Sequence, residues 1–398
     1  MSDYILKLFD RELIRFSARN MGRTPQIAIQ DIDAGALSLM PLGMEVSSRG
    51  LASWLKHRIV PRNRLCVSPF LSRFGLSENS TMGIIDISRG LSLNDSYWVV
   101  PDKFTRTFAE CNLYDHRLSE AAAWIALTGN GSSVRTPFVP IPEFTTHGML
   151  PKCWRRQNGG ICLYKRGTEG SSKMGNEPYS EYYAWQAAEI LGVRAVPYTL
   201  TKWKSVLCSR CGLFTSKELS YVPAGNVVTH GGIEAVFAYC QKLGPAYTDR
   251  LEDMFVYDAV IANTDRHLGN FGFLVDAASN TIVSSAPFFD HGNSLFNYAV
   301  PEHMESRQAF LAYADKLLPA CYDDFFTVAQ ACVRPRHREG LRRLLDFRLK
   351  RHPSYNLPPK RLKLVEFAVQ KRAARLLESR SDGRGEITFW QPTLLRRQ

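Results

Sequence analysis

The chain has 398 residues, of which 45% are hydrophobic and 22% are charged. This composition is typical of a soluble globular protein and excludes a disordered, collagen-like or small disulfide-stabilised chain. The length exceeds that of one typical domain, so two or three units with hydrophobic cores are expected. The formal net charge of +12 favours an anionic partner, such as nucleotide phosphates, nucleic acid or an acidic protein.

Several features of the chain bear on its location. No run approaches the roughly 18 apolar residues of a membrane-spanning helix. The N-terminus carries Asp3, Asp10 and Glu12 and lacks the apolar core of a signal peptide. The nine cysteines are scattered and odd in number, which indicates reduced thiols. We therefore expect a cytoplasmic protein; an effector exported without a classical signal peptide is the alternative.

Residues 1–133 are predicted to form an N-terminal α/β module. Tyr4–Phe9 and Leu13–Ala18 are apolar-rich segments on either side of Asp10-Arg11, a pattern typical of a hairpin. The module ends in a Gly/Ser-rich segment, 128–133. Its other expected elements are a strand within 91–101 and helices near 51–56, 68–74 and 119–127, and the segment 27–32 is left unassigned.

Residues 134–224 are predicted to be β-rich with one helix. Met149–Arg156 and Ile161–Arg166 flank Asn158-Gly159, and Asn-Gly is the strongest short signal for a hairpin. A helix is expected over Tyr179–Leu191, with Gly192 as its C-cap. Two further strands follow, at 196–201 and 205–208.

Residues 225–398 are predicted to be mostly helical, with one embedded hairpin at 271–275 and 281–284. The expected helices are 232–241, 246–262, 305–316, 322–331 and 360–378. The chain is therefore expected to be an α+β protein with two lobes around a cleft. The first lobe is 134–224, the second is 225–398, and the module 1–133 precedes them.

The most informative segment is Asn263–Phe273, which reads NTDRHLGNFGF between a predicted helix and a predicted strand. Asp265 and Asn270 have the Asp-x-x-x-x-Asn spacing of phosphoryl-transfer catalytic loops. A carboxylate can accept the proton of an attacking hydroxyl, and an amide oxygen can bind Mg²⁺ without adding charge. Taken alone, the pair is also compatible with a helix cap followed by a turn.

The embedded hairpin strengthens the catalytic interpretation. It is expected to return the chain so that Asp290, in the sequence Pro-Phe-Phe-Asp-His-Gly, lies beside Asn270. A second carboxylate there supplies a hard oxygen ligand for Mg²⁺. His267 either assists the base, contacts phosphate or has a structural role in the loop.

Phosphate-binding candidates precede this segment. Residues 145–148 (TTHG), here called the phosphate loop, lie where a backbone cradle for phosphates is expected, although no Gly-x-Gly-x-x-Gly or Walker A motif is present. Lys165 ends the second strand and can neutralise phosphate oxygens, and Glu181 is placed to pair with it. Lys152 is a second phosphate candidate. Each lysine, taken singly, is also compatible with a solvated surface cation.

These motifs resemble the HipA-like serine/threonine kinases, which are bacterial and phage relatives of toxin kinases. The resemblance covers roughly residues 90–300 and rests on residues 263–270, 288–290, 148–152, 163–165, 180–183 and 92–98. It implies that Asp265 is the catalytic base, that Asn270 and Asp290 hold Mg²⁺, and that Lys165 contacts ATP. Lys152, with Thr146, His147 and Gly148, would belong to the nucleotide loop, and the substrate would be a protein Ser or Thr.

The resemblance also implies control by autophosphorylation. In HipA-like kinases a hydroxyl residue seven positions before the loop lysine can be modified, and Thr145 stands at that offset from Lys152. Thr146 is the neighbouring candidate. His147 departs from the family, which usually has small residues there. No antitoxin sequence is present in the chain, so toxin behaviour is not implied.

Alternative functions follow from other features. The Asp-Arg-His-x-x-Asn string is similar to phosphoinositide kinases, which makes a lipid substrate the alternative. Eight Lys or Arg residues between Arg334 and Arg351 form either a solvated helix face or an anion surface for nucleic acid or a regulatory partner. A non-catalytic nucleotide- or DNA-binding regulatory protein is therefore the competing class. Cys208 and Cys211 could be half of a zinc site but lack a second pair, so ordinary thiols are favoured.

Overall fold

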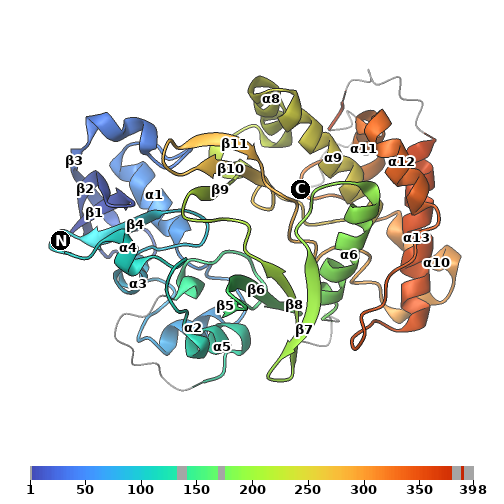
Figure 1. Ribbon diagram of the computed structural model, residues 1–398, viewed down its shortest axis with the longest axis horizontal. Coiled ribbons are helices and arrows are strands. Elements are labelled where there is room, and N and C mark those ends of the chain that lie inside the picture. The colour runs from blue at the N-terminus through green and yellow to red at the C-terminus, as the bar shows by residue number, and fades with distance from the viewer. Residues whose placement is uncertain (1, 132–140, 169–174, 379–386, 390–398) are drawn as a thin grey trace. The chain divides into compact units, whose positions relative to one another are not determined.

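The computed structural model describes residues 2–131, 141–168, 175–378 and 387–389 (Figure 1). The chain divides into two compact units. Unit 1 comprises Met1–Arg166, Arg210–Val222 and Phe273–Ser284, and unit 2 comprises Gly167–Ser209, Pro223–Gly272 and Ser285–Gln398. The predicted boundary at residue 133 lies outside the described residues. The three-part division, with two lobes around a cleft, stays a prediction.

The strands form three sheets, with the orders β3-β2-β1-β4, β5-β6-β8-β7 and β11-β10-β9. The first sheet is antiparallel and consists of β1 (Ser2–Leu8), β2 (Arg11–Arg19), β3 (Gln26–Ile32) and β4 (Tyr97–Pro101). The hairpin predicted around Asp10-Arg11 is confirmed, since Tyr4 pairs with Phe16 and Leu6 with Ile14. The predicted α+β class is also confirmed, because the described residues combine helices with antiparallel strand pairs.

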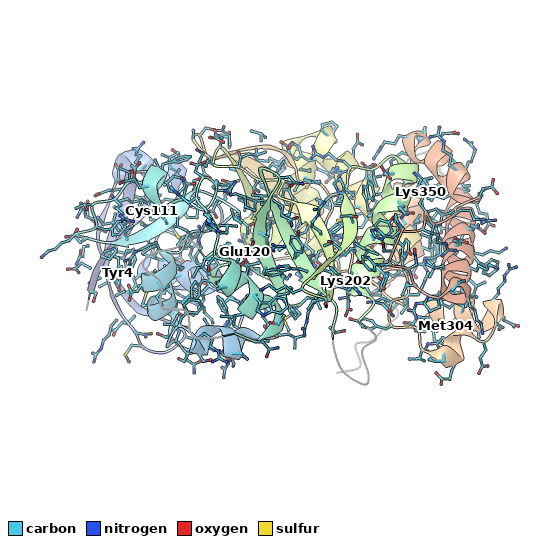
Figure 2. All side chains as sticks on the ribbon, turned by 60° about the horizontal axis from the view of Figure 1, so that its bottom comes forward. Tyr4, Cys111, Glu120, Lys202, Met304 and Lys350 are labelled. Carbon is cyan, nitrogen blue, oxygen red and sulfur yellow. The ribbon has the colours of Figure 1, made fainter. Side chains whose placement is uncertain are left out.

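Short helices of unit 1 cover this sheet (Figure 1). Leu55 of α1 and Ile85 of α3 are buried in the same core as Phe16 of the sheet. Tyr4 and Cys111, labelled in Figure 2, are both buried in this unit. The helices of unit 1 are η1 (Ala34–Leu39), α1 (Ser48–Arg58), α2 (Val67–Ser72), α3 (Thr81–Ser88), α4 (Phe108–Cys111), α5 (Glu120–Thr128) and η2 (Pro142–Phe144). Of these, η1, α1 and α3 contact the sheet, and α5 packs against β5.

A second hairpin consists of β5 (Lys152–Gln157) and β6 (Gly160–Arg166), as the Asn-Gly signal predicts. Asn158 and Gly159 both have positive φ, 49° and 80°, the conformation that a tight two-residue turn requires. β5 begins later than predicted, at Lys152, because Gly148 has a φ of +94° and Pro151 lacks the N–H that a strand ladder uses.

The other strands are β7 (Tyr198–Trp203), β8 (Val206–Gly212), β9 (Leu219–Pro223), β10 (Gly272–Asp276) and β11 (Thr281–Ser285). The predicted hairpin of β10 and β11 is confirmed. Strand β9, which pairs with β10, was not predicted from the sequence. Helix α6 (Glu177–Leu191) ends at Gly192, whose φ of +81° makes it the C-cap that the sequence predicts.

Unit 2 is mostly helical and is organised around α9 (Pro245–Ile261), which packs against α6, α8, α11 and α13. Phe255 and Tyr257 of α9 are fully buried. Helix α12 lies against α6, and a Cβ on its Gly340 would be 2.5 Å from the carbonyl oxygen of Leu191. The remaining elements are α7 (Ala224–Val227), α8 (Gly232–Leu243), η3 (Pro301–Met304), α10 (Arg307–Ala314), α11 (Phe325–Cys332), α12 (Pro335–Leu344) and α13 (Pro359–Leu377).

None of the described helices combines the length and apolar character that a membrane span requires. The described residues also contain no disulfide, and all nine cysteines are thiols, as expected from their scattered positions.

Candidate active site

The segment after α9 is held in place by backbone hydrogen bonds within unit 2. Helix α9 ends at Ile261, and Ala262 takes the left-handed conformation, with a φ of 51°. The N–H of Leu295 then donates to the carbonyl of Ile261 at 2.7 Å, and the N–H of Thr264 donates to the carbonyl of Asn293 at 3.0 Å. The predicted catalytic loop is therefore fixed against the segment that follows Asp290.

Asp265 and Asn270 lie together in this loop, as their spacing predicts. The side-chain amide of Asn270 donates to the backbone carbonyl of Asp265 at 2.9 Å. Because its nitrogen is used in this way, the Oδ1 atom of Asn270 is the end that can bind a cation. The amide of Asn293 donates to Oδ2 of Asp265 at 2.9 Å, which orients that carboxylate and leaves Oδ1 as the oxygen for a further proton donor.

Asp290 lies close enough to Asp265 to change its acidity. Burial first, and then the negative charge of Asp290, raise the pKa of Asp265. Asp290 itself has a φ of 58°, and its N–H donates to the Tyr198 hydroxyl at 3.2 Å. Two neighbouring carboxylates repel each other, so the pair favours a bound cation.

The donor set fits Mg²⁺. No group of three or more His, Cys, Asp or Glu side chains in the described residues is arranged to hold a metal. Mg²⁺ at nucleotide sites nevertheless takes one or two carboxylates and completes its shell with water and phosphate oxygens. Asp290 and Oδ1 of Asn270 are hard oxygen donors of this kind. Cys208 and Cys211 are buried on β8, and no zinc cluster forms around them within the described residues.

A buried arginine, Arg266, joins the parts of this site, and its role was not predicted from the sequence. It is only 1% exposed and forms a bidentate ion pair with Asp258 of α9, at 2.9 and 3.0 Å. Its Nη1 atom donates to the carbonyls of Asn270, at 3.0 Å, and Phe289, at 2.6 Å. The residues that precede Asp290 and the end of the catalytic loop are thus fixed to one guanidinium.

The two histidines of the site have structural contacts. Nδ1 of His267 accepts the N–H of Gly269 at 3.1 Å, which stabilises the turn of the loop. His291 is fully buried, and its Nδ1 lies 3.1 Å from Nη2 of Arg266. Through these contacts both histidines stabilise the conformation of the loop. Assistance to the base by His267 stays a prediction.

A second group of predicted residues gathers in unit 1. Lys152 and Lys165 are direct register partners in the β5–β6 hairpin, so their side chains lie on the same face. Both are buried, at 4% and 3% exposed. Gly148 has a φ of +94°, a conformation that favours glycine, and a Cβ there would lie 2.2 Å from Nζ of Lys152, so a larger residue would also displace this ammonium group. Two buried cations on one face favour a polyanionic ligand.

The threonines of the phosphate loop are engaged in hydrogen bonds. Thr145 is 2% exposed, and its hydroxyl donates to the carbonyl of Leu91 at 2.7 Å. The hydroxyl of Thr146 donates to the carbonyl of Pro142 at 2.7 Å and accepts from Nε1 of Trp154 at 3.0 Å. His147, by contrast, is exposed. In this conformation the loop is anchored by the hydroxyl groups that autophosphorylation would modify.

Glu181 is buried in α6 at 1% exposed, and the Ser209 hydroxyl donates to its carboxylate. Its predicted ion pair with Lys165 stays a prediction, because the two residues belong to different units.

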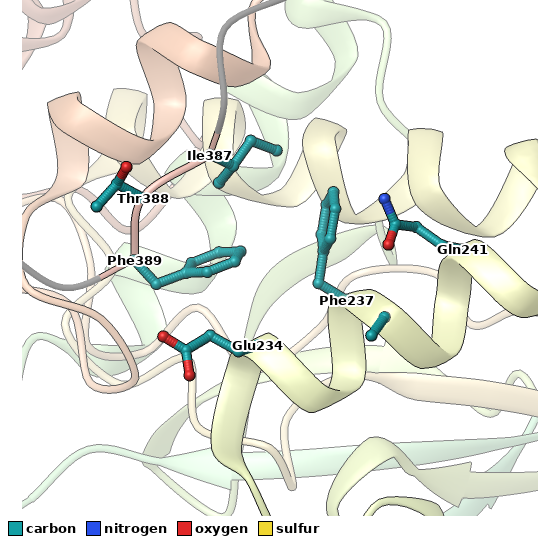
Figure 3. A pocket seen from close by; sticks show the side chains of 7 residues that line it. Glu234, Phe237, Gln241, Ile387, Thr388 and Phe389 are labelled. Carbon is teal, nitrogen blue, oxygen red and sulfur yellow. The ribbon is translucent and has the colours of Figure 1, made fainter.

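A surface pocket of about 470 Å³ lies elsewhere in unit 2, between α8 and residues 387–389 (Figure 3). Phe389 is 6% exposed and packs edge-on against Phe237, with ring centroids 5.7 Å apart. Its carbonyl accepts the N–H of Asp323 at 3.0 Å. None of the predicted site residues lines this pocket.

Comparison with known proteins supports the fold. No protein-family model and no curated protein matches the chain. Among solved structures, HipA of the Shewanella oneidensis MR-1 toxin–antitoxin system, in its complex with HipB and operator DNA, matches with a TM-score of 0.57 at 12% identity. The match covers 94% of this chain and 96% of that one.

The Helicobacter pylori proinflammatory kinase CtkA also matches, at 19% identity over 58% of this chain and 90% of that one, with a TM-score of 0.46. The HipA match, unlike this one, extends over nearly the whole of both chains. It confirms the resemblance found in the sequence at the level of the fold. The chain described here has the HipA-like kinase fold.

Proposed function

We propose that this protein is an ATP-dependent kinase that transfers the γ-phosphate to Ser or Thr of a protein substrate. The observation that carries the proposal is the gathering of Asp265, Asn270 and Asp290 around one loop, in a chain with the HipA-like fold. The same spacing and residue types serve phosphoryl transfer in protein kinases.

Asp265 is the proposed base. Its Oδ2 is held by Asn293, so Oδ1 can accept the proton of the substrate hydroxyl as that oxygen attacks phosphorus. A raised pKa makes the carboxylate a stronger proton acceptor than an ordinary aspartate. Asn270 and Asp290 would hold Mg²⁺, which neutralises charge on the phosphates when bound.

The phosphate-binding side is proposed to be the Lys152–Lys165 face of the β5–β6 hairpin. Gly148 permits close approach there, and the backbone of Thr146 and His147 would cradle phosphate oxygens. Glu181 is proposed to orient Lys165. Together these residues would neutralise the triphosphate while Asp265 positions the attacking group.

The test is transfer of label from γ-labelled ATP with Mg²⁺ to a dephosphorylated protein mixture and, separately, to phosphatidylinositol vesicles. Wild type should label protein on Ser or Thr. The Asp265→Asn variant should lose on the order of 10²–10⁴ in rate while retaining ATP binding. Label on the lipid alone would favour the phosphoinositide-kinase alternative. ATP binding without any transfer would favour a non-catalytic nucleotide-binding protein.

A matched control separates loss of the base from a general loss of negative charge. Asp276 is the last residue of β10, and its carboxylate accepts the N–H of Ser279 in the turn that follows. Asp276→Asn should therefore leave the rate unchanged.

We also propose that modification of the phosphate loop at Thr145 or Thr146 inactivates the enzyme. The Thr145 hydroxyl is buried against Leu91, so a phosphate of about −1.5 to −2 charge there requires the loop to leave this position. Wild type and Asp265→Asn would be incubated with ATP and mapped by mass spectrometry. Unmodified threonines in an active wild type would reject self-modification and leave the kinase proposal in place.

A further inference from the structure

The chain on both sides of Gly148 is attached to the segment 60–65, which follows α1 in unit 1. The N–H of Val60 donates to the carbonyl of Phe144 at 2.6 Å, and the N–H of Leu65 donates to the carbonyl of Met149 at 3.0 Å. These bonds hold the chain just before and just after the phosphate loop. Neither contact uses the Lys152–Lys165 face.

The same segment carries Arg64, whose side chain is only 4% exposed. Its Nη1 donates to the carbonyl of Thr146 at 3.4 Å, and its Nη2 donates to the carbonyl of Lys152 at close range. One rigid guanidinium therefore holds two carbonyls six positions apart in the sequence, on either side of Gly148. Because the fork of an arginine is planar, it also fixes the separation between them.

Arg64 retains its charge in this environment. Burial lowers the pKa of its guanidinium to about 10, which still leaves it protonated at neutral pH. The negative charge of Glu143, in η2, partly offsets this effect. Glu143 is 1% exposed; its Oε1 accepts the N–H of Trp154 at 2.8 Å, and its Oε2 has no hydrogen-bond partner within the described residues.

A buried charge is costly, and an apolar side chain would fill the same space without that cost. An apolar residue could not, however, donate hydrogen bonds to the carbonyls of Thr146 and Lys152. We propose that Arg64 is a positioning residue that fixes the phosphate loop to segment 60–65 and so sets the affinity for ATP. This inference rests on the proposed function for its ligand, whereas the attachment of the loop can be tested without ATP.

The first test is amide hydrogen exchange of the nucleotide-free protein. In Arg64→Lys the charge remains but the fork is lost, so amides of residues 146–150 should exchange about tenfold faster. The strands β1–β4 should exchange as in wild type. The matched control is Arg62→Lys, since Arg62 is 59% exposed and pairs only with Glu78 among the described residues, at 3.3 Å. Wild-type exchange at 146–150 in Arg64→Lys would overturn the inference.

The second test separates positioning from chemistry. Arg64→Lys should raise the KM for ATP about tenfold and change kcat by less than about threefold, because Asp265 and the metal ligands are untouched. A fall in kcat at unchanged KM would also overturn the inference. If wild type binds no ATP at all, the proposed function fails, while the exchange experiment still decides whether Arg64 holds the loop.

A double variant serves as the control in case Arg64→Lys does not fold. Arg64→Met combined with Glu143→Gln removes both buried charges and retains an acceptor for the Trp154 N–H. This variant should remain folded by circular dichroism and still show the faster exchange at 146–150. A folded double variant with wild-type exchange would show that backbone bonds alone hold the loop.

Discussion

At the scale of single residues, the pKa of Asp265 provides a direct test of the site. Burial and the charge of Asp290 both raise it, so removing that charge should lower it. We predict that Asp290→Asn shifts the carboxyl titration of Asp265 to lower pH, measured by ¹³C NMR without Mg²⁺. The same variant should weaken the Mg²⁺ dependence of ATP affinity in calorimetry, because a charged ligand is lost. An unchanged titration would show that the two carboxylates do not interact.

A second residue-scale prediction concerns stability and pH. Burial raises the pKa of Glu143 from 4.5 to about 7, so the folded state binds a proton more tightly than the unfolded state. The contribution of this group is fully present below pH 4.5 and is lost as pH rises to about 7. The loss amounts to roughly 3 kcal/mol, at about 1.36 kcal/mol per pKa unit.

Glu143→Gln keeps the acceptor for Trp154 but cannot ionise. Relative to wild type, it should therefore gain stability as pH increases from 5 to 7.5, by about 2–3 kcal/mol. Urea unfolding at both pH values measures the difference. A free-energy difference between the two proteins that does not change with pH would show that Glu143 has an ordinary pKa.

At the scale of secondary-structure elements, Arg266 joins α9 to the catalytic loop and to the segment before Asp290. Replacing it with Met leaves the fully buried carboxylate of Asp258 without its ion-pair partner. We predict a loss of about 3–5 kcal/mol in unfolding free energy for Arg266→Met. The double variant Arg266→Met, Asp258→Asn should recover part of it, because no buried charge remains. Urea denaturation of both variants is the measurement; equal stabilities would contradict the buried ion pair.

The elements that the sequence predicts well are those whose signals are local. The turn at Asn158-Gly159 and the cap at Gly192 depend on backbone conformations that few residues adopt, so they are visible in a short window. The sequence does not predict strand β9, because its partner β10 lies about 50 residues later in the chain. Where helix α12 lies, the sequence indicates only a basic segment, since its many arginines obscure the buried Leu341 and Leu344.

The same distinction applies to the site. Asp265, Asn270 and Asp290 were predictable because their spacing and an intervening hairpin bring them together. Arg266 and Arg64 were not predictable, because an arginine usually lies at the surface. These two hold loop carbonyls only because the tertiary fold buries them. The burial of Thr145 could not be predicted from the sequence either, because the carbonyl that accepts its hydroxyl, that of Leu91, is 54 residues away in the chain.

At the scale of the whole molecule, the net charge of +12 favours binding to an anionic macromolecule. The basic cluster 334–351 is partly neutralised in the structure. Arg334 pairs with Glu252 at 2.5 Å, and Arg336 pairs with Glu252 and Asp253 of α9, at 2.9 and 3.0 Å. These two arginines hold α12 and its flanks to α9. Others, such as Arg342, Arg343 and Lys350, are exposed. Lys350 is labelled in Figure 2.

This neutralisation limits how strongly the cluster can bind nucleic acid. If all eight cations contacted DNA phosphates, log K would fall with log salt with a slope of about −7, at about −0.9 per contact. With Arg334 and Arg336 held by carboxylates, we predict a slope no steeper than about −5 for a DNA duplex between about 50 and 200 mM salt. Fluorescence anisotropy measures it, and a steeper slope would mean that both arginines leave their partners.

A pair of variants makes the prediction specific to the cluster. Arg343→Ala removes an exposed cation whose partner is Glu339 on the same helix, so it should make the slope about 1 unit shallower if the cluster contacts DNA. Arg336→Ala should leave the slope unchanged and instead lower the unfolding free energy, because it breaks ion pairs to α9. If neither variant changes the slope, then any DNA binding arises from another part of the basic surface, and the cluster is a solvated helix face.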